Sequence, residues 1–210
     1  MKAGRDPAPW TAAERRTLDA LDSPGAIQRF LDGLEYSSDP IYRAPAEVLR
    51  DRKAHCFDGA CFAAAALRRL GYPPRLVDLR AVRDDDHVLA VFRRGVGWGA
   101  VSKSNFTGLR FREPIFRTLR ALVLSYFEDY FNTAGEKTLR SCSRPVSLAP
   151  FDRRRWTHDS SVMEAIAARL DAAPHARLLT PAMERALAPV DPRTLEAGLL
   201  GANAAGLYRA

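Results

Sequence analysis

The sequence is poor in cysteine and has no long apolar stretch. Its three cysteines are an odd number, and Cys56 and Cys61, five residues apart, would point in different directions from a helix. No disulfide framework is therefore expected. The apolar runs fall well short of the roughly 18 to 20 residues that a membrane span needs. The opening residues MKAGRDPAPW lack the apolar segment of a signal peptide. We therefore expect a cytoplasmic protein without a membrane span.

Two kinds of ligand site are also missing from the sequence. The spacings of the candidate metal ligands fit neither paired CxxC knuckles nor a helical HxxxH pair; these ligands are His55, Cys56, Cys61 and His87. The glycines of GVGWGA join two expected strands and do not lead into a helix, which excludes a Walker or dinucleotide loop. We expect no metal site and no other cofactor.

Positive charge is abundant but unevenly placed. The 210 residues are 47% hydrophobic and 27% charged, as is ordinary for a soluble globular protein, and carry a net charge of +7. Residues 75–120 hold ten Arg or Lys against five acids. This surplus is typical of a solvated basic face, although its summed field could also attract an acidic substrate or nucleic acid. We do not expect nucleic-acid binding, because the aromatic residues of this stretch fall where packing needs them.

Caps and periodicity predict an α+β fold. An alanine-rich helix should begin near Cys56 and end at Gly71, which suits a C′ position. The other expected elements are helices over 11–21, 24–34, 45–51 and 114–132, strands over 75–82, 87–94 and 98–104, a further strand within 137–148, and two or three helices within 160–200. We divide the chain into an N-terminal helical segment (1–44), a core (45–150) and a C-terminal helical extension (151–210) packed on the same domain.

Cys56 is the candidate nucleophile. At the start of a helix, unpaired backbone N–H groups and the helix dipole favour thiolate over thiol and so lower the pKa. The same N–H groups can bind the oxyanion of a tetrahedral intermediate. Asp58, in the first turn of this helix, is expected to cap it and is a secondary candidate for the pocket.

His87 is the candidate general base. A nucleophilic thiol needs an imidazole within hydrogen-bond reach to take its proton and later pass it to the leaving group. His87 begins an expected strand, from which its side chain can project toward a helix packed on the sheet. His55 is the rival, but neighbouring side chains diverge, so it cannot easily point at the Cys56 sulfur.

This arrangement resembles the transglutaminase-like superfamily, a papain-like group. The matching residues are Cys56 with the helix through ALRRLGYPPRLV, then His87 in HVLAVFRR, then Gly97-Trp98 in GVGWGAVS. The resemblance covers roughly residues 45–105. It implies a papain-like core in which a central helix bearing the cysteine packs on an antiparallel sheet, and it makes Trp98 a candidate wall of the oxyanion pocket.

The chain departs from this family at the third catalytic position. The family usually has an aspartate four residues after the Gly-Trp tryptophan, and this sequence has Ser102 there. A serine can orient the imidazole only through a neutral hydrogen bond. Ser102 is the first candidate and Asn105 the alternative.

The resulting functional hypothesis is a cysteine-dependent amide or peptide hydrolase, or an acyltransferase, that acts through Cys56, His87 and a thioester acyl-enzyme. The expected substrates are peptides, proteins or small amides, and the basic surplus favours an acidic acyl donor. The alternative is a non-catalytic transglutaminase-like module that binds a protein or peptide in the same groove.

Overall fold

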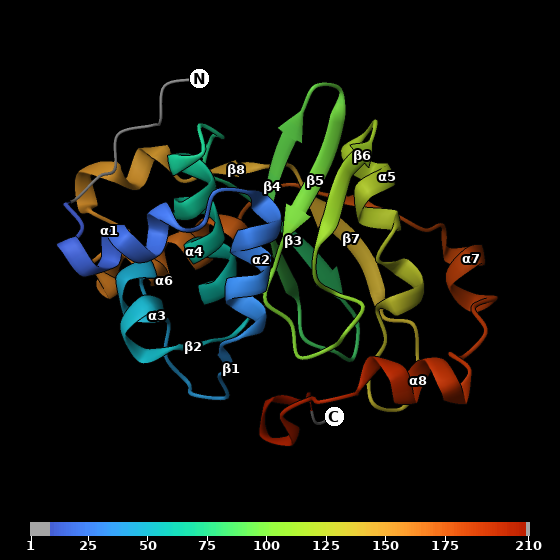
Figure 1. Ribbon diagram of the computed structural model, residues 1–210. Helices are drawn as coiled ribbons and strands as arrows, with labels where there is room; N and C mark the ends of the chain where they lie inside the picture. Colours follow the sequence, from blue (N-terminus) through green and yellow to red (C-terminus); the bar gives the residue numbers. More distant parts are fainter. Residues whose placement is uncertain (1–8, 209–210) are drawn as a thin grey trace.

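One helix, α4 (Cys56–Arg69), lies at the centre of the fold. It begins and ends where the sequence predicts. Gly71 follows its last turn with a φ of 88°, a left-handed conformation that glycine adopts without strain. The alanines of α4 are almost fully buried, so the helix can approach the sheet closely. The computed structural model describes residues 9–208, and Figure 1 shows α4 between the N-terminal helices and the strands.

Seven strands of the described chain form one antiparallel sheet in the order β6-β5-β4-β3-β7-β9, with β8 also paired to β3. β3 and β4 pair so that Leu79 faces His87 and Asp78 faces Val88. The strands are β3 (Arg75–Ala81), β4 (His87–Arg94), β5 (Gly97–Val101), β6 (Arg112–Phe116), β7 (Leu139–Ser143), β8 (Val146–Ser147) and β9 (His175–Arg177). This is the antiparallel sheet with a cysteine-bearing helix that the sequence predicts.

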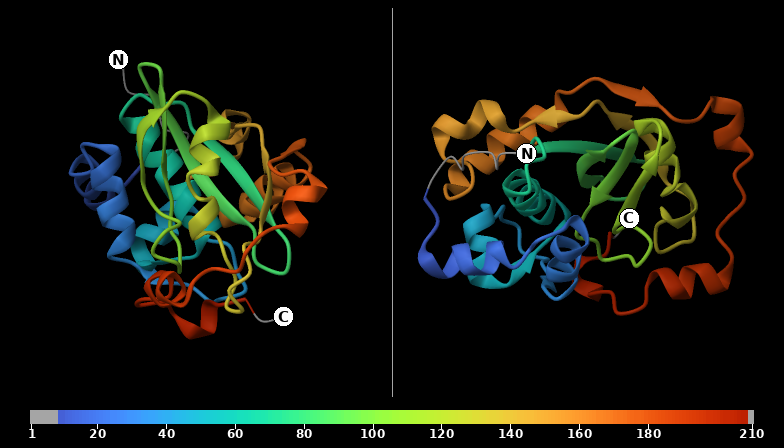
Figure 2. Two further views of the ribbon diagram at one scale, coloured as in Figure 1. Left: turned by 90° about the vertical axis from the view of Figure 1, so that its right-hand side faces the viewer. Right: turned by 45° about the horizontal axis from the view of Figure 1, so that its top comes forward.

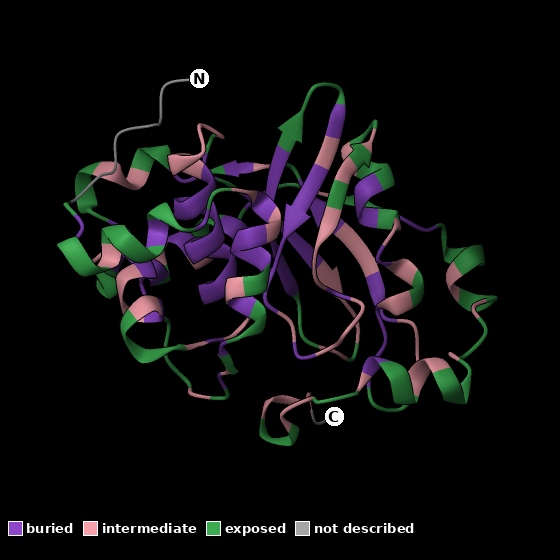
Figure 3. Cartoon of the chain, viewed as in Figure 1, coloured by how far each residue is buried: buried purple, intermediate pink, exposed green. Residues whose placement is uncertain are grey.

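The two faces of the sheet carry separate cores. Alternate residues of β4 divide between them: Val88, Ala90 and Phe92 pack with α4, whereas Leu89 and Val91 pack with the segment that contains α5 (Leu119–Leu124). Figure 3 shows both α4 and the central strands as buried. His87, the first residue of β4, shares the parity of Leu89 and Val91, and its ring lies 6.3 Å from that of Tyr130, centroid to centroid. The expectation that it projects from the sheet toward α4 is therefore wrong.

The N-terminal helices cover α4. Thr11 and Glu14 form the predicted capping box of α1, and Pro45 begins α3. The elements are α1 (Ala12–Asp19), α2 (Pro24–Asp32), α3 (Pro45–Asp51) and the short parallel pair β1 (Glu35–Tyr36) and β2 (Lys53–Ala54). The right-hand view of Figure 2 shows α1 and α3 toward one end of the molecule and α7 at the other, with α2 and the strands between them.

The helix predicted over 114–132 is wrong in its first part. Residues 112–116 form β6 against β5, and only α5 and the short helix η1 (Phe127–Asp129) are helical beyond it. Ile115, assigned to the buried stripe, is 73% exposed. The apolar spacing of this stretch suits either element, and pairing with the edge of β5 decides for the strand.

The C-terminal part holds the two or three helices predicted within 160–200 and further elements beside them. It holds the predicted helical turns and also β9, which the sequence did not indicate. The helical elements are η2 (Ala149–Arg154), η3 (Ser160–Val162), α6 (Met163–Asp171), α7 (Pro181–Arg185), α8 (Pro192–Gly198) and η4 (Ala204–Gly206). The division at residues 44 and 150 stays a prediction.

In the part of the chain that the structure describes, none of the helices is both long enough and apolar enough to cross a membrane. Most of the opening segment, where the sequence predicts no signal peptide, lies outside the described residues.

Candidate functional site

His55 and Asp58 cap the start of α4 through two reciprocal hydrogen bonds. The His55 Nδ1 accepts from the backbone N–H of Asp58 at 3.4 Å, and the Asp58 carboxylate accepts from the His55 N–H at 3.5 Å. Burial, followed by the nearby Arg43 charge, lowers the pKa of His55 to about 4. His55 therefore caps the helix with its Nδ1 lone pair.

Asp58 has the capping role that its position predicts. Its carboxylate is fully buried and also accepts from the Arg43 N–H at 2.8 Å. Burial raises the pKa of Asp58 to about 7, against the lowering effect of the N–H groups of Arg43 and His55. Asp58 lines neither of the cavities that Cys56 lines, so the structure does not support it as a pocket residue.

The Cys56 sulfur lies against the first residues of β4. Its thiol donates to the Asp86 carbonyl at 3.7 Å, and the backbone N–H groups of Val88 and Phe57 donate to the sulfur. The residue as a whole is half-buried, but the sulfur itself is enclosed. Burial raises the pKa of Cys56 to about 12, although the two N–H groups act to lower it. The predicted lowering of this pKa is therefore wrong for the structure as it stands, because desolvation outweighs the helix start.

His87 is fixed by two acceptors at one ring nitrogen. Its Nε2 lies 2.8 Å from the Ser102 Oγ and 2.9 Å from the Leu109 carbonyl, and the Ser102 hydroxyl donates to the same carbonyl at 2.7 Å. A carbonyl can only accept, so Nε2 must carry the proton. Burial lowers the pKa of His87 to about 4, which keeps the ring neutral. The Nδ1 atom is therefore left with its lone pair.

Ser102 is in turn positioned by α2. The Gln28 side chain accepts from the Ser102 N–H at 3.1 Å and donates to the Ser102 carbonyl at 2.9 Å. Both residues are buried. The sequence did not indicate Gln28 or the Leu109 carbonyl, because both reach His87 or Ser102 through tertiary contacts.

Cys56 and His87 line one small cavity of about 40 Å³. Tyr36, also in its wall, accepts the backbone N–H of Cys56 at its phenol oxygen. Burial raises the pKa of Tyr36 well above its usual range, so the phenol stays protonated. Tyr36 lies on a two-residue strand without a distinctive motif, so the sequence did not indicate it.

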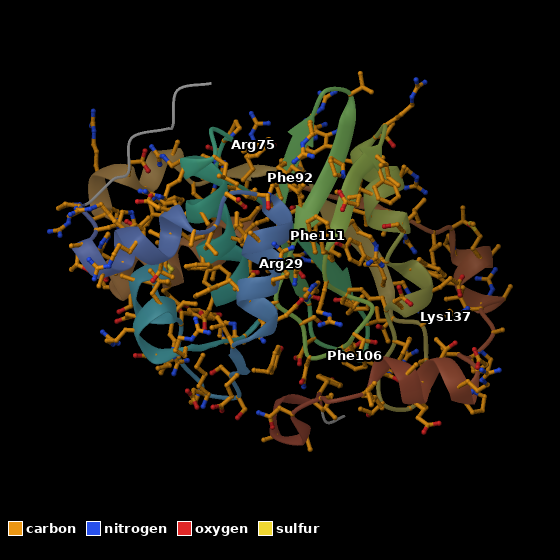
Figure 4. The ribbon with its side chains drawn as sticks, in the orientation of Figure 1. Arg29, Arg75, Phe92, Phe106, Phe111 and Lys137 are labelled. Carbon is orange, nitrogen blue, oxygen red and sulfur yellow. The ribbon has the colours of Figure 1, made fainter. Side chains whose placement is uncertain are left out.

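Gly206 and Tyr208, from the segment that follows α8 (residues 203–208), line this cavity, and Figure 1 shows this segment at the lower edge of the molecule. Asn105 and Asn203 exchange two hydrogen bonds, of 2.9 and 2.7 Å, and the Asn203 amide donates to the Tyr36 carbonyl at 3.0 Å. Gly206 packs on the Tyr36 ring, where a Cβ would lie 2.8 Å from a ring carbon. In Figure 4, Phe106 lies at this same lower end. Asn105 therefore holds the segment, and Ser102 is the residue that contacts His87.

The model of the transglutaminase-like superfamily matches residues 13–102, a stretch that holds Cys56 and His87 and ends at Ser102. These residues form a transglutaminase-like core. Its match begins with the two N-terminal helices, earlier in the chain than the resemblance seen in the sequence.

Solved structures similar to this chain include two of Legionella pneumophila LapG. One is 18% identical with a TM-score of 0.35, over 44% of this chain and 59% of that one. The other, EGTA-treated, is 14% identical with a TM-score of 0.40, over 75% of this chain and 86% of that one. No curated protein matches the chain.

Trp98 does not take the pocket position that the family resemblance gave it. It pairs with Arg93 near the β4–β5 turn, and Arg93 lies over its ring at 5.4 Å. Arg93 lies six positions beyond His87 along β4, or about 20 Å of extended strand. Trp98 packs instead against the core on the sheet face away from α4.

A second, larger cavity of about 780 Å³ opens beside Cys56 in this transglutaminase-like core. Its apolar wall includes Phe57, Val88 and Leu170, and its rim carries several aspartates. This cavity gives a substrate room next to the sulfur.

Proposed function

We propose that this protein is a cysteine-dependent amidase, peptidase or acyltransferase with Cys56 as its nucleophile. One observation carries the proposal. Ser102 and Leu109 fix the proton of His87 on Nε2, which leaves Nδ1 unprotonated, and His87 and Cys56 line the same small cavity.

The reaction starts from a neutral pair, because the thiol pKa is raised and the imidazole pKa is lowered. As the sulfur bonds to the substrate carbonyl carbon, the thiol proton moves to the His87 Nδ1. The carbon–nitrogen bond then breaks, and the same proton goes to the departing amine. Water or an amine next attacks the thioester and passes its proton through His87 to the Cys56 sulfur. Hydrolysis and transfer differ only in this acceptor.

Two donors support the oxyanion in this scheme: the Cys56 N–H and the Tyr36 hydroxyl. They already meet at the small cavity, with the phenol accepting from the N–H. A carbonyl oxygen that takes the place of the phenol oxygen on this N–H can receive a hydrogen bond from each group.

Tyr36→Phe is expected to slow acylation of Cys56 by about 10- to 100-fold, because one oxyanion donor is lost. The rate is measured with p-nitrophenyl acetate as acyl donor. Tyr42→Phe is the matched control, since Tyr42 lines the large cavity and contacts the rings of His55 and Phe57. A Tyr36→Phe rate equal to that of the Tyr42→Phe protein would contradict the oxyanion role.

The test of the proposed function is capture of the acyl-enzyme. The protein is mixed with p-nitrophenyl acetate, and peptide mass spectrometry locates the acetyl group. We expect a thioester on Cys56, none in the Cys56→Ala protein, and full reactivity in the Cys61→Ala protein. Cys142 is buried and serves as an internal reference. If Cys56 is acetylated no faster than Cys142, the enzymatic proposal is wrong.

The protonated thiol and the overlying segment favour one alternative, a transglutaminase-like module that binds a peptide without chemistry. The same experiment separates the two, because a binding module forms no acyl-enzyme.

A further inference from the structure

The large cavity beside Cys56 has an acidic wall. Five of its lining residues are aspartates, and none of its described lining residues is Lys or Arg; the aspartates are Asp39, Asp78, Asp85, Asp86 and Asp171. His55, also in the wall, is kept neutral by its lowered pKa. A substrate that approaches Cys56 through this cavity therefore meets carboxylates.

Two of these aspartates are balanced within the protein. Asp39 pairs with Arg43 and with Lys53, at 3.2 Å from the latter. Asp78 lies 2.9 Å from the His175 Nε2 and 3.8 Å from the Arg80 Nε. These internal partners largely offset the charges of Asp39 and Asp78.

The other three carboxylates belong to exposed residues at the rim: Asp85, Asp86 and Asp171. Arg80, which also donates to the Asp171 carbonyl, is the cation behind this rim. Burial and the charge of Asp86 raise the pKa of Asp85. Such a rise is expected where nearby cations do not offset the negative charge of neighbouring carboxylates. Arg80, which also faces Asp78, and His175 both act to lower the pKa of Asp86. The carboxylates of Asp78, Asp85, Asp86 and Asp171 outnumber these two groups, so this part of the cavity is negative.

None of the basic residues of 75–120 lines the cavity, although Arg80 lies behind its rim. Arg75 lies at the end of the sheet away from Phe106, as Figure 4 shows, and Arg93 and Arg94 end β4 on that side. Lys103 is buried and donates to the Leu31 and Leu34 carbonyls at 2.9 and 2.6 Å. The acidic acyl donor predicted from net charge is therefore not what the site favours.

The cavity also has an apolar wall suited to an aliphatic stem. Phe57, Val88 and Leu170 line it together with the carboxylates, in a volume of about 780 Å³. Lysine and arginine side chains bury such a stem on apolar surface while the charged end stays at a polar rim.

We propose that the substrate carries a cationic group, of the lysine or arginine side-chain type, which lies at the Asp85–Asp86–Asp171 rim when Cys56 attacks its carbonyl carbon. This inference rests on the proposed function of Cys56. It adds a charge preference that the transglutaminase-like core alone does not specify.

The test uses three small methanethiosulfonates that carry a trimethylammonium, a sulfonate or no charge. The rate constant for Cys56 with each reagent is divided by that for N-acetylcysteinamide, which removes intrinsic reactivity. We expect the cation-to-anion ratio at Cys56 to exceed that of the free thiol by about tenfold or more at low salt. It should shrink toward the free-thiol value in about 1 M salt.

The variants Asp85→Asn and Asp86→Asn should each lower this ratio severalfold. Asp22→Asn, the same charge change at an exposed residue between α1 and α2, should leave it unchanged. A Cys56 ratio equal to that of the free thiol, or unaffected by the two rim variants, would overturn the inference. Capture of the acetyl-enzyme with the neutral ester tests the nucleophile separately, so either proposal can fail alone.

Discussion

His87→Ala is expected to slow acylation of Cys56 by about 10³-fold, because the thiol starts protonated and loses the base that removes its proton. The rate should also show where His87 titrates. A neutral imidazole is required, and the lowered pKa of His87, about 4, keeps the ring neutral at higher pH. Acylation should therefore hold steady from about pH 9 down to about pH 5 and fall only as pH approaches 4.

His87→Gln provides the matched control for this prediction. Glutamine can still donate to the Leu109 carbonyl but has no basic nitrogen. It should be as slow as His87→Ala, and circular dichroism should show that both proteins are folded. Added imidazole should restore part of the rate in His87→Ala. Retained activity in His87→Gln, or a midpoint near pH 6.5 in the native protein, would show that His87 does not act as the buried base described here.

Gly59→Ala is expected to destabilise the protein by about 2–3 kcal/mol. Alanine normally favours a helix by about 1 kcal/mol over glycine, but a Cβ at Gly59 would lie under 3.0 Å from the Lys103 Cβ. Lys103 cannot easily move aside, because its ammonium holds two backbone carbonyls of the α2 region. The clash therefore outweighs the helix propensity. Urea unfolding measures the change in free energy, and acetylation of Cys56 reports whether the start of α4 has moved.

Gly25→Ala is the corresponding control in α2. The nearest atom to its added Cβ is the Arg29 Nη1 at 3.6 Å, an ordinary contact. Its stability should match or slightly exceed that of the native protein. If Gly59→Ala were equally stable, α4 would not pack on the sheet as closely as the structure shows.

Local signals in the sequence were enough to predict the elements that carry Cys56 and His87. Alanine propensity and Gly71 define α4, and turns rich in aspartate and glycine separate β3, β4 and β5. These signals act over a few residues and do not depend on the rest of the fold. The stretch 114–132 has no such signal, and β6 forms only because β5 offers it an edge.

The surroundings of Cys56 and His87 could not be predicted from local signals. The Leu109 carbonyl and Tyr36 reach the site from a loop and a two-residue strand that tertiary packing positions. The pKa directions of Cys56 and His87 depend on burial, which the helix-dipole argument does not include. The sequence could still indicate Ser102 as a neutral partner for the imidazole, and the structure has that contact. Its catalytic role stays a prediction.

The hydrogen bonds between Asn105 and Asn203 join residues 98 positions apart. A ribosome adds about 5–20 residues per second, so roughly 5 to 20 s pass between the synthesis of the two asparagines. During that interval, the sulfur and imidazole are already part of the nascent chain, while the segment that covers them does not yet exist. Each molecule therefore passes through an early period in which its thiol is more open to small electrophiles and oxidants than in the finished fold.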